Sequence, residues 1–406
     1  MARSPRPDNH QTVSPHDAEW LVSQSAAERL ELARSGQDEL ERTTALRRRG
    51  LSAHQATLAA QLIELRSRAR VKFAAAEQMF FTRRSLEQAT DQHIADYKAQ
   101  SFASCRQVVD LCCGIGGDSI SLARVVPRLL AVDLDPVLCT FANRHLHDSK
   151  TGSYEVRCEQ AERFNLTDCD GWHIDPDRRP ADTRVTAANY MLPDHSALGE
   201  MLKSAPDAAI KVAPATPEVT WPVPTRREWI GHRRECQQQI VWTGRFANGS
   251  PRQATVLDAQ GSPHSLSGTG EERASSVPEC GPLVVEPHPA VLAAGLVGAL
   301  ASSHQWHTFT ADQAYLTGHT SIPSPLVATF QVIDLLPFRP DSLRRELKRR
   351  GISITEVKRR AVHFDLESLR RQLTLTDGSP HTLIVARQGA KAVAIVAQRV
   401  AQVSVS

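Results

Sequence analysis

The stretch VVDLCCGIGGDSISLARVVPRLLAVDLD, residues Val108–Asp135, decides the fold of this chain. Its apolar start predicts a short buried strand that closes at Asp110. Glycines follow at once, at positions 114, 116 and 117, and predict a tight turn. The apolar residues of SISLARVV then have helical spacing, and Leu129–Val132 predicts a second buried strand that ends at Asp133. This order of strand, turn, helix and strand is typical of an α/β domain.

The same stretch has the features of a ligand site. Glycines let the backbone come close to a ligand, and the helix after them directs its free N–H groups at a negative group. Asp133, at the tip of the second strand, is placed to bind the two hydroxyls of a ribose. We therefore predict a site for a nucleoside-containing cofactor, and a glycine-rich turn without a ligand is the alternative.

A dinucleotide is one possible cofactor, but its fingerprint G-x-G-x-x-G is incomplete, because Ser119 stands at the third glycine position. Asp118 at the start of the helix would repel a pyrophosphate and suits a ligand with an ammonium group, and Asp110 points the same way. The stretch resembles the first motif of class I S-adenosylmethionine (SAM) methyltransferases, here as D-x-x-C-G-x-G-G-D. The resemblance implies SAM as the cofactor and an α/β fold, a Rossmann-like seven-stranded methyltransferase sheet.

The resemblance also assigns residues to the cofactor. After a third strand predicted at Tyr154–Cys158, Gln160 and Ala161 match the family's turn beside the adenine, where Asp is commoner than Gln. Cys112 is favoured as a small turn residue, and a reactive thiol is the alternative. The candidate cofactor-binding residues are Asp110, Cys112, Gly114, Gly116, Gly117, Asp118, Asp133, Leu134, Gln160 and Ala161.

The second chemical feature follows a fourth strand predicted at Gly171–Asp175. It resembles the (Asn/Asp)-Pro-Pro-(Tyr/Phe) motif of amino-group methyltransferases and the Asp-Pro-Pro-Arg motif of some RNA enzymes, which present the substrate nucleophile. Asp175 is expected to accept hydrogen bonds from an amine, and positioning supplies most of the rate of an in-line transfer. No aromatic residue follows Pro176, so a base needs its stacking partner elsewhere, and a salt-bridged turn is the alternative. The candidate catalytic residues are Asp175, Pro176, Asp177, Arg178 and Arg179.

Composition limits the remaining possibilities. The chain has 406 residues, 41% of them hydrophobic and 23% charged, which predicts a globular protein of two or three domains. Its net charge of +3 is mild, so any affinity for nucleic acid must come from a local patch. No apolar run is long enough for a membrane span, and the N-terminus has no apolar signal core. The eight cysteines form no C-x-x-C pair, so we predict reduced thiols, no metal site and a cytoplasmic location.

Four parts are predicted along the chain. They are a disordered tail at 1–14, an N-terminal helical region at 15–100, the methyltransferase domain at 101–260 and an α+β domain at 281–406. Breaks in the helical region are expected near Ser35–Gly36 and at Gly50. Its segment Lys72–Thr90, with Thr82 as the predicted N-cap, either borders the site entrance or docks two helices, and docking is favoured.

The later elements are predicted from short apolar runs. Strands five to seven of the methyltransferase sheet are placed at Ala208–Ala213, Gln239–Trp242 and Ala254–Leu257. Residues 259–279 are predicted to be a polar loop or hinge. The helices expected beyond it are Ala290–Leu300, Asp341–Arg350 and Leu366–Leu373, among strands at 331–336, 352–357, 382–386 and 392–396.

The C-terminal part resembles the THUMP-like domain that follows the catalytic domain in a bacterial methyltransferase family. The resemblance runs from about Lys72 and includes the segments FFTR…LEQAT and DPxRR. THUMP domains proper are tied to RNA modification, which implies RNA, such as tRNA or rRNA, as the partner. A basic stretch would bind its phosphates, and a solvated helix face is the alternative. That stretch contains Arg344, Arg345, Lys348, Arg349, Arg350, Lys358, Arg359 and Arg360.

The combined prediction is a class I SAM-dependent methyltransferase that acts on RNA, at a base or an exocyclic amine. One alternative is a methyltransferase for a small metabolite or a protein, in which the C-terminal domain serves only for packing. Another is a non-catalytic RNA-binding protein that keeps the SAM fold. The oligomeric state is left open.

Overall fold

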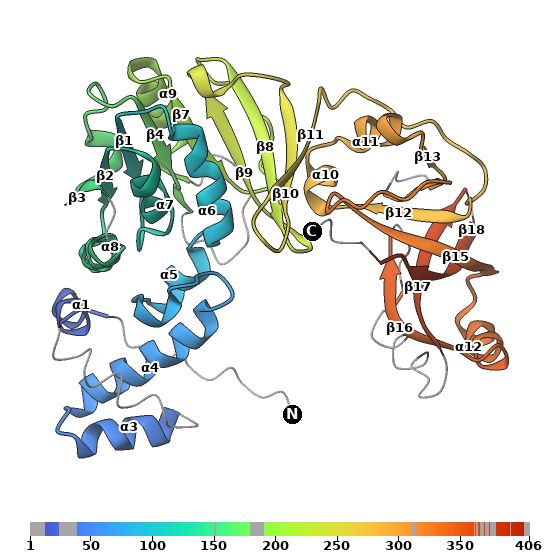
Figure 1. Ribbon diagram of the computed structural model, residues 1–406, viewed down its shortest axis with the longest axis horizontal. Helices are drawn as coiled ribbons and strands as arrows, with labels where there is room; N and C mark the ends of the chain where they lie inside the picture. Colours follow the sequence, from blue (N-terminus) through green and yellow to red (C-terminus); the bar gives the residue numbers. More distant parts are fainter. Residues whose placement is uncertain are drawn as a thin grey trace. The chain divides into compact units, whose positions relative to one another are not determined.

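A computed structural model describes most of the chain (Figure 1). The described residues are 13–23, 39–149, 152–178, 191–310, 314–360, 379–389 and 391–401, together with Val362, Phe364, Asp365, Leu369 and Leu373. They fall into two compact units. The first comprises Met1–Lys211, Pro217–Pro224 and Thr243–Phe246, and the second comprises Val212–Thr216, Thr225–Trp242 and Ala247–Ser406. Most of the predicted tail, the break at 35–36 and Arg179 lie outside the described residues, as does most of the helix expected at 366–373.

Helices begin the first unit, and their caps explain where they start. Ser14, Ser52 and Thr82 each accept a hydrogen bond from the backbone of the third helical residue and form capping boxes, which confirms Thr82 as an N-cap. The predicted break at Gly50 is also confirmed, because its φ is +87°. The helices are α1 (Pro15–Leu21), α3 (Glu39–Arg48), α4 (Ala53–Ala69), α5 (Arg83–Gln88) and α6 (Gln92–Ala99).

The first unit also holds parallel strands in the order β7-β4-β1-β2-β3. They follow the apolar runs read from the sequence, and helices connect them as the α/β prediction requires. Their carboxyl ends therefore meet at one edge. The strands are β1 (Gln107–Leu111), β2 (Arg128–Asp133), β3 (Ser153–Cys158), β4 (Gly171–Ile174) and β7 (Ala208–Val212). The helices are α7 (Gly117–Val125), α8 (Pro136–Asp148) and α9 (His195–Ser204), and β5 (Asp177–Arg178) pairs with β6 (Met191–Leu192) as a short antiparallel ladder.

Four further strands of the same sheet lie in the order β11-β10-β8-β9. The four strands are β8 (Thr225–His232), β9 (Glu235–Thr243), β10 (Arg252–Leu257) and β11 (Pro263–Gly268). Two of them, β8 and β11, were not predicted from the sequence. The sheet has nine strands among the described residues, so the predicted count of seven is too low. Strand β8 was not predicted because its charged residues interrupt the apolar pattern of a buried strand. Its Glu228 is nevertheless only 1% exposed and accepts hydrogen bonds from Trp242 at 2.7 Å and Thr255 at 2.6 Å. Part of the predicted hinge, 263–268, pairs with β10 as an antiparallel strand.

A separate seven-stranded sheet makes up the rest of the second unit, in the order β13-β14-β12-β15-β18-β17-β16. The helix expected at 290–300 is divided, because Gly295 has a φ of +69° and ends its first part. The helices are α10 (Pro289–Ala293), α11 (Val297–His304) and α12 (Pro340–Arg349). The strands are β12 (Leu283–Pro287), β13 (His307–Thr308), β14 (Leu316–Gly318), β15 (Val327–Pro337), β16 (Ile352–Arg359), β17 (Ser379–Gln388) and β18 (Lys391–Arg399).

The amphipathic helix α12 packs through Leu343 and Leu347 onto a core that contains Ile354 of β16 and Leu383 of β17. Its charged side chains occupy the opposite face. Among the described helices, none combines the length and the apolar character needed to cross a bilayer.

Candidate functional site

The glycine turn between β1 and α7 has the backbone geometry that the sequence predicts. Gly114 and Gly116 have φ values of +57° and +80°, which glycine adopts without strain. A Cβ atom at Gly116 would lie 3.3 Å from Cβ of Ala142 in α8, so the turn is packed closely on that side. A Cβ at Gly114 would meet nothing within 4 Å. The turn thus offers open space at Gly114, immediately before the N-terminus of a helix.

Asp133 holds this turn to the end of β2. Its Oδ2 accepts a hydrogen bond from the Gly114 N–H at 2.8 Å, and its Oδ1 accepts one from the N–H of Asp135 at 2.9 Å. Burial raises the pKa of this carboxyl despite those hydrogen bonds. Leu134 follows and is 64% exposed, an unusual position for a large apolar side chain.

The end of β3 lies beside this carboxylate. The Glu159 N–H donates to the carbonyl of Asp133 at 3.0 Å, which fixes the start of the next turn. Gln160 is exposed, and Ala161 is buried at the start of a short 3-10 helix, Ala161–Arg163. The structure therefore brings together five predicted cofactor residues at neighbouring strand ends: Gly114, Asp133, Leu134, Gln160 and Ala161.

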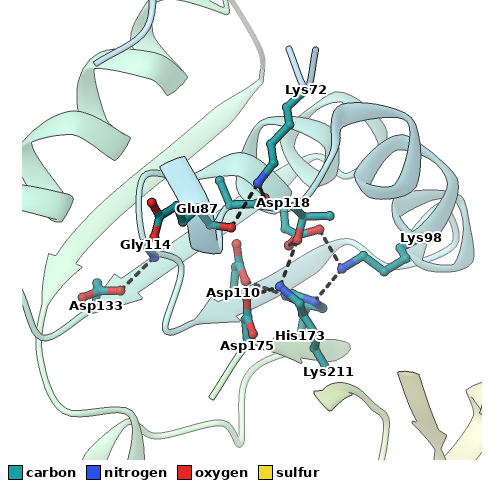
Figure 2. Close-up of polar contacts among 12 residues, drawn as sticks. Lys72, Glu87, Lys98, Asp110, Gly114, Asp118, Asp133, His173, Asp175 and Lys211 are labelled. Atoms are coloured by element: carbon teal, nitrogen blue, oxygen red, sulfur yellow. Dashed lines mark hydrogen bonds and ion pairs between the residues drawn. The ribbon is translucent and has the colours of Figure 1, made fainter. Parts of the chain in front are cut away.

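Asp110, by contrast, is fully buried beneath the turn, and both its carboxylate oxygens have partners (Figure 2). Ser119 donates its hydroxyl to Oδ2 at 2.5 Å, and Nδ1 of His173 lies 2.7 Å from Oδ1. Nε2 of His173 is in turn 3.2 Å from Nζ of Lys98. Because an ammonium only donates, we assign Nε2 as the acceptor and place the ring proton on Nδ1. Asp110 thus supports the turn through a charged chain.

Asp118 completes this buried chain. Its Oδ1 lies 2.8 Å from Nζ of Lys98, which is only 2% exposed, and its Oδ2 accepts the Thr90 hydroxyl at 2.8 Å. Burial by itself raises the pKa of the Asp118 carboxyl. The positive charge of Lys98, with smaller contributions from more distant groups, outweighs this effect, so the pKa lies far below its usual value. Asp118 is therefore an anion at the N-terminus of α7, where the helix dipole also favours negative charge.

The tip of β4 carries the second motif. Nζ of Lys211 in β7 lies 2.5 Å from Oδ2 of Asp175, and Pro176 is buried (Figure 2). Asp177 and Arg178 form β5 and so continue directly from this tip. The salt-bridged turn that the sequence left as an alternative thus has an ion pair, in which Lys211 of β7 is the cation.

The two cysteines of the turn are neutral thiols. Burial raises the pKa of Cys112 and of Cys113 well above the ordinary value, and the nearby carboxylates add to the effect. A thiol needs a lowered pKa to react readily at neutral pH. This supports the interpretation of both cysteines as small turn residues.

The segment Lys72–Thr90 docks helices, as the favoured interpretation has it. Phe80 and Phe81 are buried in one core with Ile115 of the glycine turn. His145 of α8 accepts the Phe80 N–H at 2.7 Å and donates to the carbonyl of Ile115 at 2.8 Å. Burial lowers the pKa of His145 to about 4, so the ring is neutral at physiological pH.

Four polar residues of this site escaped the sequence analysis. Lys98 and Thr90 come from the helical region, His173 lies in β4 and Lys211 lies in β7. The signal was present for the last two, because a basic residue interrupts the short apolar runs GWHI and AAIKV. Such residues occur in buried strands when a partner satisfies them.

The basic C-terminal stretch is partly neutralised within the second unit. Arg349 and Arg350 pair with Glu346, and Lys358 pairs with Glu286 at 2.7 Å. Arg359 donates to a backbone carbonyl, that of Phe364. Within the described part of the chain, no ion pair is found for three exposed cations of α12: Arg344, Arg345 and Lys348.

Known proteins resemble this chain over most of its length. An uncharacterized SAM-dependent methyltransferase of Mycobacterium tuberculosis, known from strains H37Rv and CDC 1551, is 29% identical over 320 residues, which is 77% of this chain and 86% of the relative. The crystal structure of a candidate methyltransferase from Porphyromonas gingivalis W83 aligns with a TM-score of 0.72 at 19% identity and covers 95% of this chain and 97% of the other. Residues 327–399 match the family described as THUMP domain-like. The predicted fold is thereby confirmed, and the chain is similar over most of its length to SAM-dependent methyltransferases, with a match to the THUMP-like family in its C-terminal part.

Proposed function

We propose that the chain methylates RNA, at a base nitrogen or an exocyclic amine, with SAM bound at the glycine turn. One observation carries this proposal: the glycine turn with Asp133 and the Asp175–Pro176 tip both follow strands whose carboxyl ends share one edge of the sheet. A cofactor held by the first would have its reactive end within reach of an acceptor held by the second. No metal ion is needed in this arrangement.

The residues present fit SAM. Asp133 accepts the ribose hydroxyls, Leu134 covers the adenine with its exposed side chain, and Gln160 and Ala161 border the ring. Gly114 leaves room for the methionine part, Gly117 begins the helix α7 beside it, and Asp118 sets a negative potential that suits its ammonium group. Asp110 and Cys112 shape the turn from below. When bound, SAM supplies an electrophilic methyl group on its sulfonium.

At the acceptor side, Asp175 accepts hydrogen bonds from the incoming nitrogen and orients its lone pair toward the methyl group. Pro176 restricts the backbone, and the residue types of Asp177, Arg178 and Arg179 in the sequence suit a phosphate-bearing substrate. Because the transfer is an in-line displacement, alignment supplies most of the rate. An amine releases its proton after transfer, so the proposal needs no general base.

RNA is the proposed acceptor on two grounds. The resemblance to THUMP domains ties the C-terminal part to RNA modification, and Arg344, Arg345 and Lys348 leave exposed charge on α12 for phosphates. We place the domain boundaries as predicted from the sequence, with methyl transfer in residues 101–260 and RNA contact in 281–406. A gel shift with bulk tRNA and rRNA at several salt concentrations tests this part, and binding that ignores salt would favour a small metabolite or a protein as the acceptor.

Calorimetry with SAM tests the cofactor site. We expect the wild-type chain to bind SAM and Asp133→Ala to lose roughly tenfold or more in affinity, as loss of a charge-assisted bidentate contact implies. Asp168→Ala, an exposed carboxylate in the same unit, is the matched control and should bind SAM normally. No binding by the wild type, or equal binding by both variants, would refute the proposal. Mass spectrometry of nucleosides from parent and deletion strains then identifies the methylated atom.

A further inference from the structure

Strand β7 carries Lys211 as the fourth residue of the otherwise apolar run AAIKV. Its side chain is 14% exposed, yet its Nζ lies 2.5 Å from Oδ2 of Asp175 (Figure 2). The same Nζ lies 3.2 Å from Oγ1 of Thr90. Placing a largely buried ammonium in a strand costs desolvation free energy and side-chain entropy. The two oxygen partners offset that cost, and both belong to the surroundings of the site.

The contact between Lys211 and Asp175 is set by the sheet. Strands β4 and β7 are parallel neighbours, and Ile174 pairs with Ile210 in their register. Asp175 directly follows the last residue of β4, and Lys211 is the next residue of β7, so the backbone places the two charges beside each other. An exposed ion pair between flexible side chains has no such constraint, and the Asp175 carboxylate here has a defined position.

Thr90 links this pair to the start of α7. The Lys211 ammonium donates to Thr90 Oγ1, and the Thr90 hydroxyl donates to Oδ2 of Asp118 at 2.8 Å. A hydroxyl has one proton and two acceptor lone pairs, so both bonds form together. The chain from Asp175 through Lys211 and Thr90 to Asp118 therefore joins the acceptor motif to the glycine turn.

We propose that Lys211 is a positioning residue for methyl transfer, which holds the Asp175 carboxylate in the orientation that receives the acceptor nitrogen. The inference rests on the proposed function, because it gives Asp175 its role. Thr90 fixes the ammonium from the other side. The segment before the α/β domain thus contributes to the alignment of the acceptor, and the proposed action of Lys211 is through Asp175.

Methyl-transfer kinetics test this role. The assay follows tritium from labelled SAM into bulk tRNA and rRNA purified from a deletion strain. Lys211→Met should lower kcat about 10- to 100-fold, because a small misplacement of a reacting group costs that much, while the SAM affinity from calorimetry stays as in the wild type. Lys211→Arg, which keeps the charge, should recover part of the loss. Thr90→Val should show a milder form of the same defect, and Thr90→Ser should restore activity.

Lys203→Met is the matched control, since Lys203 is an exposed lysine of the same unit that pairs with Glu200. It should keep the wild-type kcat. Thermal unfolding of every variant separates a misplaced carboxylate from a poorly folded chain. If Lys211→Met transfers methyl groups at the wild-type rate, or loses SAM affinity in proportion to kcat, the positioning role is wrong.

A measurement without substrate keeps the two proposals apart. In a ¹⁵N spectrum selective for lysine ammonium groups, the Lys211 signal is identified by its loss in Lys211→Arg. It should shift in Asp175→Asn and in Thr90→Val, and stay in place in Lys203→Met. An unchanged signal in Asp175→Asn would overturn the inference alone. Absence of methyl transfer to any RNA by the wild-type chain would instead overturn the proposed function.

Discussion

Two sets of charged residues, one in each unit of this protein, differ in their surroundings. In the first unit, Lys98, Asp110 and Asp118 are almost fully buried, and each has partners within the unit. In the second unit, α12 exposes its basic residues, and Arg344 and Lys348 have no ion-pair partner among the described residues. Buried charges are expensive to desolvate and must be paired. We propose that the first set supports the cofactor site, whereas the second is available to a ligand.

The largest effect should come from breaking the buried chain at Lys98, the lysine that pairs with Asp118. Lys98→Met leaves Asp118 as a buried anion with a weakened set of partners, and removal of one partner from a buried pair costs roughly 3–5 kcal/mol. Denaturant unfolding measures this loss. The exposed Lys203→Met should leave the free energy of unfolding close to that of the wild type. Equal stability of the two variants would show that the buried chain does not stabilise the first unit.

Acid should destabilise both units through buried histidines. Burial lowers the pKa of His145 in the first unit and of His288 in the second to about 4, from 6.5. The unfolded chain then binds more protons, so stability is full above pH 6.5 and falls as the pH drops toward 4. For fully buried His145 the loss is about 3 kcal/mol.

Urea unfolding between pH 4 and pH 7 checks this sign. His145→Gln should lower stability at pH 7, because two hydrogen bonds to backbone groups are disturbed, and should flatten the pH dependence. A variant that keeps the wild-type slope would contradict the assignment of His145 as the titrating group.

A smaller effect, on binding and not on folding, is expected at α12. Replacing all three of Arg344, Arg345 and Lys348 by serine should weaken RNA binding roughly tenfold. The slope of log K against log salt concentration should become shallower by about 0.7–0.9 for each charge lost. The free energy of unfolding should be unchanged, because these side chains are exposed. Fluorescence anisotropy with labelled tRNA at several salt concentrations measures both quantities. Undiminished affinity would place the RNA-binding surface elsewhere.

The smallest effect should come from Arg349→Ser on the same helix. Arg349 already donates two hydrogen bonds to Glu346, so less of its charge is available to phosphate. Its loss should change RNA affinity and salt dependence less than loss of Arg344. The reverse order in the same anisotropy assay would show that the ion pairs of α12 open on binding.

The sequence predicted the parts of the site that local patterns encode. In Val108–Asp133 the apolar runs predict the strands and the glycines predict the turn, and Thr82 predicts the start of a helix. Partners from distant segments are not visible in this way: Lys98 meets His173 across 75 residues of sequence. Strand β8 was missed for a related reason, because Glu228 is satisfied by Trp242 and Thr255 from other strands.

The central claim is that SAM lies between Asp133 and the Asp175 tip at one edge of the sheet. A crystal structure of the chain with S-adenosylhomocysteine tests it most directly. We predict ribose hydroxyls on the Asp133 carboxylate, adenine against Leu134 and the sulfur facing Asp175. A ligand bound away from the glycine turn, or with its sulfur directed away from Asp175, would contradict the claim.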